Sequence, residues 1–328
     1  MSSVDVKADK VCANCGKAEV DDVKWNGPAA GVDNIRLEEC DKCDLVKYCS
    51  TNCREEHREQ HHEECKRRAD ILHDKRLFTQ PDGTHLGECP ICFLPMSLGP
   101  RKSIFMQCCG KRICNGCISE NFREKINTHD NYAKATQCVF CRTSPSDEEE
   151  YKKRIRERIE ANDPAALFHR GKDFYEAGDY NKALEYFTKA AELGDAQAHY
   201  NLGGMYLGVG VGVEKDAKKT VYHLEKAAIG GHPYARHDLA CCEEKIGNME
   251  RAVKHWIIAA NLGCVKSMKE LLSSYKNGYI TKEEYGATLR SHQATINAAK
   301  SSQREAEERS GLLEWADMSS KKRGSRKK

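Results

Sequence analysis

The sequence predicts a multidomain protein in which two small zinc-binding modules precede an all-α solenoid of helical repeats. The chain has 328 residues, enough for two or three domains. Of its 18 cysteines, fifteen fall between Cys12 and Cys141, mostly in CxxC pairs. Behind them, glycine, alanine and leucine positions recur at intervals of 32 and 37 residues, the range of helical repeats. These three observations set the expected order of the domains.

The cysteines are better explained by zinc than by disulfides. Residues 1–10, MSSVDVKADK, lack the apolar core of a secretory signal, and no apolar run of about 18 residues occurs. We therefore expect a cytoplasmic or nuclear protein, where thiols stay reduced, rather than a secreted disulfide framework. Fifteen thiolates and one histidine on four zinc ions would lower the formal charge of +3 to about −4. Bulk charge therefore gives little reason to expect nucleic acid binding.

The first module is expected at residues 12–65, after a flexible N-terminus at 1–11. A CxxC turn brings two thiolates to one tetrahedral ion. His61 and Cys65 are four residues apart, on one face of a short helix expected at 54–64. The eight candidate ligands form four pairs: Cys12 with Cys15, Cys40 with Cys43, Cys49 with Cys53, and His61 with Cys65.

This order of ligands resembles the MYND zinc finger, above all in the tail Tyr48-Cys49-x3-Cys53-x7-His61-x3-Cys65. The stretch between Cys15 and Cys40 is longer than usual, so an inserted loop around Gly27-Pro28 is expected. The resemblance implies a cross-brace in which Cys12, Cys15, Cys49 and Cys53 hold zinc 1, and Cys40, Cys43, His61 and Cys65 hold zinc 2. It also implies a surface that docks peptide segments of partner proteins, with no open metal position for catalysis.

The second module is expected at residues 89–142, after a linker at 66–88, and it resembles an all-cysteine variant of the RING finger. The resemblance implies that Cys89, Cys92, Cys114 and Cys117 hold zinc 3, and that Cys138, Cys141 and two residues of the stretch 108–111 hold zinc 4. We expect these two to be Cys108 and Cys109. One departure is Lys111, which stands where the family has a metal-binding histidine. A protonated lysine has no lone pair for a metal, so we expect Cys108 to replace it. A three-ligand site is the alternative, because adjacent cysteines chelate one ion only if the backbone adjusts.

The RING resemblance implies non-covalent catalysis with no nucleophile in the chain. Ile91, inside the first CxxC pair, would pack on a ubiquitin-conjugating enzyme, and Arg142 would contact both that enzyme and ubiquitin through its planar fork. Val139 departs from the proline usual inside the last pair. The alternative is that Ile91 is a small-core residue and Arg142 a solvated surface charge.

A charged helical linker at 143–160 leads to the repeats, expected at 161–300. Each unit is predicted to form two amphipathic helices, with apolar residues at helical spacing, as from Ala183 to Ala191. The unit that begins Ala198-His-Tyr-Asn-Leu202-Gly203 and ends Lys226-Ala227-Ala228 resembles the Sel1-like repeat, a relative of the tetratricopeptide repeat. The resemblance implies a concave surface for partner proteins. A stack that only spaces or stabilises the molecule is the alternative.

Residues 301–328 are expected to form a charged, basic tail, with six basic residues among the last eight. Such a tail suits a nuclear address, a non-specific contact with anionic surfaces, or a disordered solubilising end. Two functions stay open: a zinc-binding adaptor that uses the MYND and repeat surfaces, or a RING-type E3 ubiquitin-protein ligase whose MYND finger and repeats recruit substrates. Proteins are the expected partners in both, and neither a membrane nor specific nucleic acid binding is expected. The sequence does not name the partners, the pathway or the oligomeric state.

Overall fold

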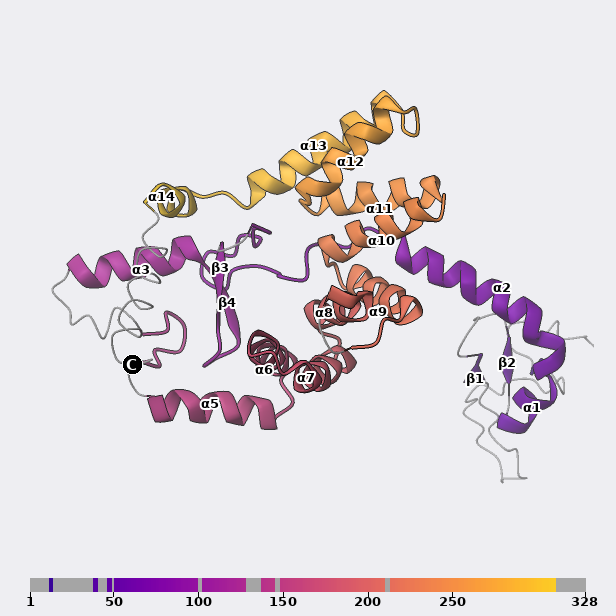
Figure 1. Cartoon of the computed structure of the whole chain (residues 1–328), viewed down its shortest axis with the longest axis horizontal. Helices are drawn as coiled ribbons and strands as arrows, with labels where there is room; N and C mark the ends of the chain where they lie inside the picture. Colours follow the sequence, from indigo (N-terminus) through magenta and orange to yellow (C-terminus); the bar gives the residue numbers. More distant parts are fainter. Residues whose placement is uncertain are drawn as a thin grey trace, which may run out of the picture. The chain divides into compact units, whose positions relative to one another are not determined.

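The structure is a computed structural model. It describes residues 12–13, 38–40, 46–48, 50–99, 102–127, 137–144, 148–209 and 213–310. The chain divides into two compact units, Met1–Thr79 and Gln80–Lys328, each treated by itself below (Figure 1). Among the described residues, the helices are too short or too polar to cross a bilayer.

The first unit contains a small hairpin followed by two helices. Strands β1 (Glu38–Glu39) and β2 (Lys47–Tyr48) pair antiparallel. Helix α1 (Thr51–Glu56) begins after Ser50, whose hydroxyl accepts a hydrogen bond from the backbone N–H of Cys53 at 3.2 Å. Helix α2 (Arg58–Leu77) runs beyond the short helix expected at 54–64 and into the segment predicted as a linker. Its sequence holds neither glycine nor proline, so nothing local ends it sooner.

The second unit starts with an irregular segment, followed by a hairpin and a helix. Strands β3 (Ser103–Met106) and β4 (Lys111–Cys114) pair antiparallel, with Ser103 opposite Cys114. Helix α3 (Asn115–Asn127) follows β4 directly. This arrangement places the cysteines of β4 and α3 beside those of the preceding turn.

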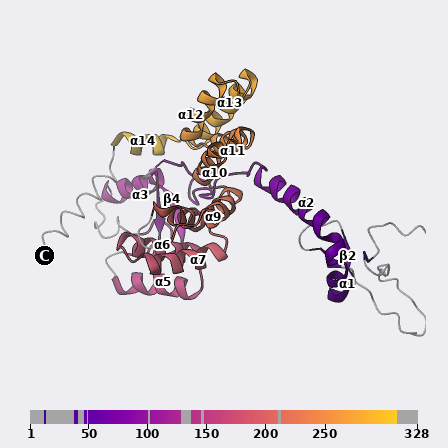
Figure 2. The ribbon, with the colours of Figure 1, turned by 45° about the vertical axis from the view of Figure 1, so that its right-hand side comes forward.

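Helix α5 (Glu148–Glu160) leads into a solenoid of antiparallel helix pairs (Figures 1 and 2). Aspartate side chains such as Asp163 and Asp195 accept hydrogen bonds from the N–H groups that begin a helix. Glycines in the left-handed region, such as Gly194 (φ 87°), end one. The helices are α6 (Pro164–Glu176), α7 (Tyr180–Glu192), α8 (Ala196–Gly204), the short π-helical segment η2 (Met205–Val209), α9 (Ala217–Ile229), α10 (Pro233–Lys245), α11 (Met249–Asn261), α12 (Val265–Lys276) and α13 (Lys282–Ala298).

The solenoid core lies between the two helices of each pair and between successive pairs. Phe187 and Leu202 are fully buried in one cluster, and Trp256 and Leu271 are fully or almost fully buried in another. The prediction of an all-α repeat solenoid is confirmed. The helix pairs continue through α12 and α13, where the repeat pattern in the sequence is weak.

The last described helix, α14 (Ser302–Ser310), returns to pack against α3 (Figures 1 and 2). The sequence predicted a charged tail over 301–328, but part of this segment is folded. Arg304 and Glu307 are only 7% and 6% exposed. Charge alone therefore misled the prediction, because these charged groups find partners on a distant element.

The cysteine-rich module of the second unit lies directly against the repeats. The Phe105 ring on β3 stacks on His169 of α6, with centroids 4.0 Å apart. His85 stacks on His232 at 4.1 Å, and its backbone N–H donates to the carbonyl of Gly231 at 3.0 Å. A side-chain hydrogen bond at 3.1 Å also joins His85 to Gln197 on α8. These contacts make the module and the solenoid one folded unit.

Candidate metal centres

The first cysteine cluster of the second unit joins two pairs of thiols from separate parts of the chain. The sulfurs of Cys89, Cys92, Cys114 and Cys117 all lie within 4.8 Å of one another. Cys89 and Cys117 are 3.9 Å apart, and Cys92 and Cys114 are 3.8 Å apart. A zinc ion bound at about 2.3 Å by four sulfurs separates them by about 3.8 Å, whereas a disulfide needs about 2.05 Å. The spacing therefore fits a tetrahedral metal and excludes disulfides within the cluster.

The fold presents these thiols from a turn, a strand end and a helix start. In the turn, the N–H of Phe93 donates to the carbonyl of Cys89 at 2.8 Å, and the N–H of Cys89 donates to Leu94 at 3.0 Å. Phe93 is held at φ 55°, in the left-handed region, which curls the turn around the two sulfurs. Cys114 ends β4, and Cys117 lies in the first turn of α3.

The second cluster contains both adjacent cysteines. The sulfurs of Cys108, Cys109, Cys138 and Cys141 lie within 4.8 Å of one another. Cys109 is 3.7 Å from Cys138, and Cys108 is 3.4 Å from Cys141. The backbone bends at Gly110 (φ 72°), whose N–H donates to Met106 at 2.8 Å. This tight turn lets neighbouring side chains point to one site.

Lys111, at the position of the family's histidine, is placed elsewhere. Its ammonium lies 5.6 Å from the centroid of the Phe140 ring, a cation–π contact. The geometry is thus that of a four-thiol site in which Cys108 supplies the fourth sulfur.

Both four-thiol clusters need a bound cation to balance the charge of four ionised sulfurs. Burial, reinforced by neighbouring thiols, raises the pKa of Cys108 and Cys117. Burial would also raise the pKa of Cys89, but backbone hydrogen bonds from Cys114, Cys92 and Ile91 lower it to about 7. At Cys141 the Thr143 hydroxyl and N–H outweigh burial and lower the pKa to about 6. Four such thiols cannot all ionise side by side unless a metal supplies positive charge, and a set of four thiolates suits zinc.

The first unit brings together three of the four residues predicted to hold zinc 2. Cys40, His61 and Cys65 place their ligand atoms within 4.8 Å of one another, and the two sulfurs are 3.7 Å apart. Burial, followed by the neighbouring His57, lowers the pKa of His61, which favours the neutral ring that a metal ligand requires. Cys43, the predicted fourth ligand, lies outside the described residues.

The remaining MYND ligands are described only in part. Cys12 is 2% exposed, and its backbone forms an isolated parallel β-bridge with Lys47 of β2. Cys53 packs against the small core that Cys12, Cys40 and Tyr48 make. Cys15 and Cys49 lie outside the described residues, so the zinc 1 set stays a prediction.

The two residues predicted to contact a conjugating enzyme both lie on the surface. Ile91 is 41% exposed, so it is not a core residue, and Arg142 is exposed with φ 64°. They lie on the turns of different cysteine clusters. Their role stays a prediction.

One residue of the site could not be predicted from the sequence. Arg304, on α14, donates to the sulfur of Cys92 at 3.3 Å. Burial raises the pKa of Cys114, while hydrogen bonds from Cys117 and Arg304 oppose that rise. Arg304 lies in a charged segment 212 residues after Cys92, and no local motif could have identified it as part of the site.

The fold and these clusters define a zinc-finger protein with a helical-repeat solenoid. Residues 12–65 match the MYND finger family, residues 196–232 and 234–264 match the Sel1 repeat, and residues 164–195 match the tetratricopeptide repeat. The chain therefore carries a MYND finger, which implies zinc binding, and Sel1 repeats. The RING resemblance of residues 89–142 stays a prediction.

Comparisons with known proteins give partial similarities to one curated relative and to solved structures. The F-box protein At1g70590 of Arabidopsis thaliana is 36% identical over 77 residues, 24% of this chain and 21% of that protein. The chain thus spans about a fifth of the length of this relative. Among solved structures, a Sel1 repeat protein from Oxalobacter formigenes is 25% identical, with a TM-score of 0.35, covering 37% of this chain and 97% of that one. The antigen c5321 of uropathogenic Escherichia coli is 19% identical, with a TM-score of 0.39, covering 57% and 44%.

Proposed function

We propose that this protein is a zinc-dependent adaptor that binds partner proteins through its repeats and its MYND finger. The observation that carries this proposal is a groove of about 400 Å³ on the solenoid, lined by residues of α6, α8, η2, α9 and α10. Its size falls in the range of sites that hold a few side chains of a ligand. Its lining includes Tyr175, Tyr200, Leu207, Asp238 and Lys245.

The chemistry of the groove suits a short peptide segment. Met205 and Leu224 give it an apolar floor. At one side the Tyr200 hydroxyl donates to the Asp238 carboxylate, whose pKa is raised by burial. A partner segment with apolar side chains and one donor aimed at Asp238 would satisfy both surfaces.

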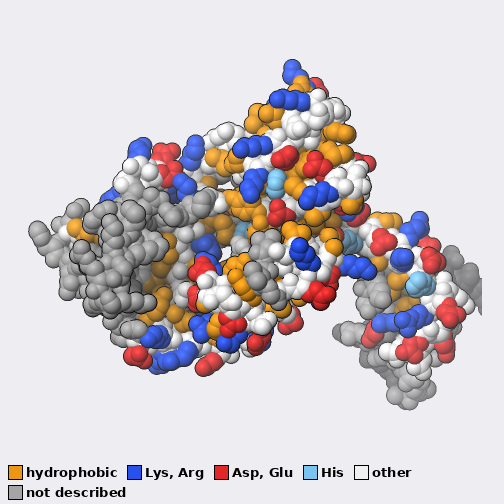
Figure 3. Space-filling model, in the orientation of Figure 1, with side chains coloured by type: hydrophobic (Ala, Val, Ile, Leu, Met, Phe, Trp, Pro, Cys, Tyr) orange, Lys and Arg blue, Asp and Glu red, His pale blue; other side chains and the backbone are white. Residues whose placement is uncertain are grey.

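The metal centres support this proposal by their ligand count. Four protein donors fill the coordination of a tetrahedral zinc, so each centre would shape a docking surface rather than hold a substrate. On the face seen in Figure 3, basic and acidic side chains are interspersed over the described repeats. Such mixed charge suits protein partners better than a polyanion.

The test selects peptides from a displayed library against the full-length, zinc-loaded protein and titrates them by fluorescence anisotropy. Leu207→Arg places a charge in the groove at a side chain that is 57% exposed, so the fold should tolerate it. The matched control is Leu289→Arg on α13, which is 45% exposed and outside the groove. We expect Leu207→Arg to weaken binding at least about tenfold and the control to leave it within about twofold. Equal effects, or no selected peptide, would refute a groove-binding adaptor.

A second candidate is the RING-type E3 ubiquitin ligase, favoured by the interleaved cysteine pairs and by the exposure of Ile91 and Arg142. The test is discharge of ubiquitin from a charged conjugating enzyme by the full-length protein. We expect Ile91→Ala and Arg142→Ala to abolish the acceleration of ubiquitin discharge. The control is Ile246→Ala at the end of α10, where the side chain is 76% exposed, and it should keep the acceleration. If no enzyme in a broad panel is accelerated, this candidate falls and the adaptor remains.

A further inference from the structure

Helix α14 reaches the cluster of Cys89, Cys92, Cys114 and Cys117 through one buried arginine. Arg304 is 7% exposed, and its Nη2 donates to Cys92 Sγ at 3.3 Å and to the carbonyl of Leu94 at 3.2 Å. Its Nη1 donates to the carbonyls of Pro95 and Ala299, both at 2.7 Å. A single guanidinium therefore joins the metal-binding turn to the chain that leaves α13.

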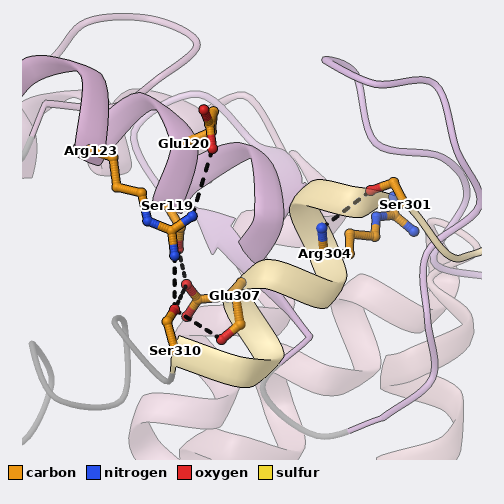
Figure 4. A network of polar contacts seen from close by, with 7 residues as sticks. All are labelled: Ser119, Glu120, Arg123, Ser301, Arg304, Glu307 and Ser310. Atoms are coloured by element: carbon orange, nitrogen blue, oxygen red, sulfur yellow. Dashed lines mark hydrogen bonds and ion pairs between the residues drawn. The ribbon is translucent and has the colours of Figure 1, made fainter.

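A second set of polar contacts fastens the rest of α14 to α3 (Figure 4). Ser119 donates to the carboxylate of Glu307, and both side chains are buried. Arg123 donates to the hydroxyl of Ser310 at 2.8 Å. Ser119 and Glu307 are buried polar groups from distant parts of the sequence, and each needs a hydrogen-bond partner. Their pairing therefore specifies one docked position of α14 on α3.

The two helices also approach each other at the level of the backbone. A Cβ atom at Gly116, in the first turn of α3, would lie 2.7 Å from the backbone nitrogen of Arg304. Only glycine permits so close an approach. The contact is therefore a fitted interface, specific to this pair of helices.

Charge gives Arg304 a particular role at the metal. Four thiolates around Zn²⁺ carry a net charge of about −2, which is costly to bury unless it is neutralised. Arg304 places its guanidinium in contact with this cluster. In the other four-thiol cluster a neutral group, the Thr143 hydroxyl, lies 3.1 Å from Cys141.

We propose that Arg304 is the outer-sphere cation of this metal site, and that α14 is a latch whose closure depends on the site being filled. The Arg304 guanidinium lies against the sulfur of Cys92, so a filled site, whose sulfurs are fixed around the ion, also fixes the partner that holds Arg304 in place. By linkage, docking of α14 must strengthen metal binding as much as the metal strengthens docking. Loss of the metal therefore releases the C-terminal helix from α3. This inference does not rest on the adaptor function.

The test measures alkylation of each cysteine by N-ethylmaleimide in the full-length, zinc-loaded protein, resolved by mass spectrometry. Removing an outer-shell partner typically costs about 10- to 100-fold in metal affinity. We expect Arg304→Gln to speed alkylation of Cys92 and Cys114 by that factor, with Cys108 and Cys141 within about twofold of wild type. Arg304→Lys, which keeps the charge and loses the fork, should fall between. Arg309→Gln is the matched control, because Arg309 is exposed on the same helix.

A second variant tests the latch without touching the metal site. Glu307→Gln weakens the contact with Ser119, so hydrogen exchange of 302–310 should quicken, and alkylation of Cys92 should quicken with it. Chelation of zinc should free the same amides in the wild-type protein. The proposal is overturned if Arg304→Gln leaves Cys92 unchanged or speeds both clusters equally. It is also overturned if Glu307→Gln loosens α14 while Cys92 keeps its wild-type rate.

Discussion

Substitution of Gly231 tests whether the cysteine-rich module is built onto the repeats. Gly231 ends α9 with φ 77°, and its carbonyl accepts a hydrogen bond from the N–H of His85 at 3.0 Å. A Cβ atom there would lie 2.7 Å from the carbonyl oxygen of Gly83. Gly231→Ala must therefore push the segment that carries His85 away from the solenoid.

The repeat offers a matched control at Gly194, the equivalent position after α7. Its φ is 87°, and a Cβ there would meet nothing within 4 Å. Both substitutions place alanine in the left-handed region, at a cost of about 1–2 kcal/mol. Only Gly231→Ala also disturbs the His85 hydrogen bond, worth about 0.5–1.5 kcal/mol, and the stack of His85 on His232, worth about as much. The excess is therefore about 1–3 kcal/mol.

Hydrogen exchange of the His85 amide measures this excess directly, because that N–H is the donor to Gly231. An excess of about 1–3 kcal/mol corresponds to exchange about 5- to 150-fold faster in Gly231→Ala than in Gly194→Ala. Urea unfolding followed by helical circular dichroism, at fixed zinc concentration, should rank the variants in the same order. Equal exchange rates at His85 in the two variants would refute the interface described here.

Three further predictions concern the metal, the core and pH. The full chain should carry about four zinc ions by elemental mass spectrometry, and Cys108→Ser and Cys109→Ser should each lower the zinc content by about one ion per chain. An unchanged zinc content in either variant would show that the replaced cysteine is not a ligand. Phe187→Ala should lower the free energy of unfolding by about 3–5 kcal/mol in urea, because Phe187 is fully buried, and a loss under about 1 kcal/mol would contradict its core role. Burial, followed by the charge of Arg112, lowers the pKa of His169 to about 3. Because the folded pKa lies below the unfolded value of about 6.5, its contribution is present above pH 6.5 and lost as the pH falls toward 3. His169→Phe keeps an aromatic ring against Phe105. Between pH 7.5 and 5.5 the free energy of unfolding of this variant should fall by about 1 kcal/mol less than that of the wild type, and equal falls would exclude His169 as a source of acid sensitivity.

The candidate metal ligands of the front half could be named from local spacing. Chelation needs donors a few residues apart, so CxxC pairs and the His61–Cys65 pair identify candidate ligands without knowledge of the fold. The presence of Cys108 beside Cys109 left two geometries open. The bend at Gly110, which the structure supplies, brings both sulfurs to one site.

The sequence by itself determined the all-α repeats and the paired candidate ligands, because helical periodicity and chelate spacing are short-range patterns. The grouping of distant pairs was only implied by the resemblance to zinc-finger families. Only the tertiary structure decided that the second module is joined to the repeats through Phe105 and His85, and that α14 returns to the metal-binding turn. The reason is physical. A contact between residues 92 and 304 is selected by burial, shape and charge complementarity across the folded chain. None of these produces a repeating pattern in the local sequence. From the sequence Arg304 looks like a solvated surface charge, and only the folded chain shows its contacts with Cys92 and Gly116.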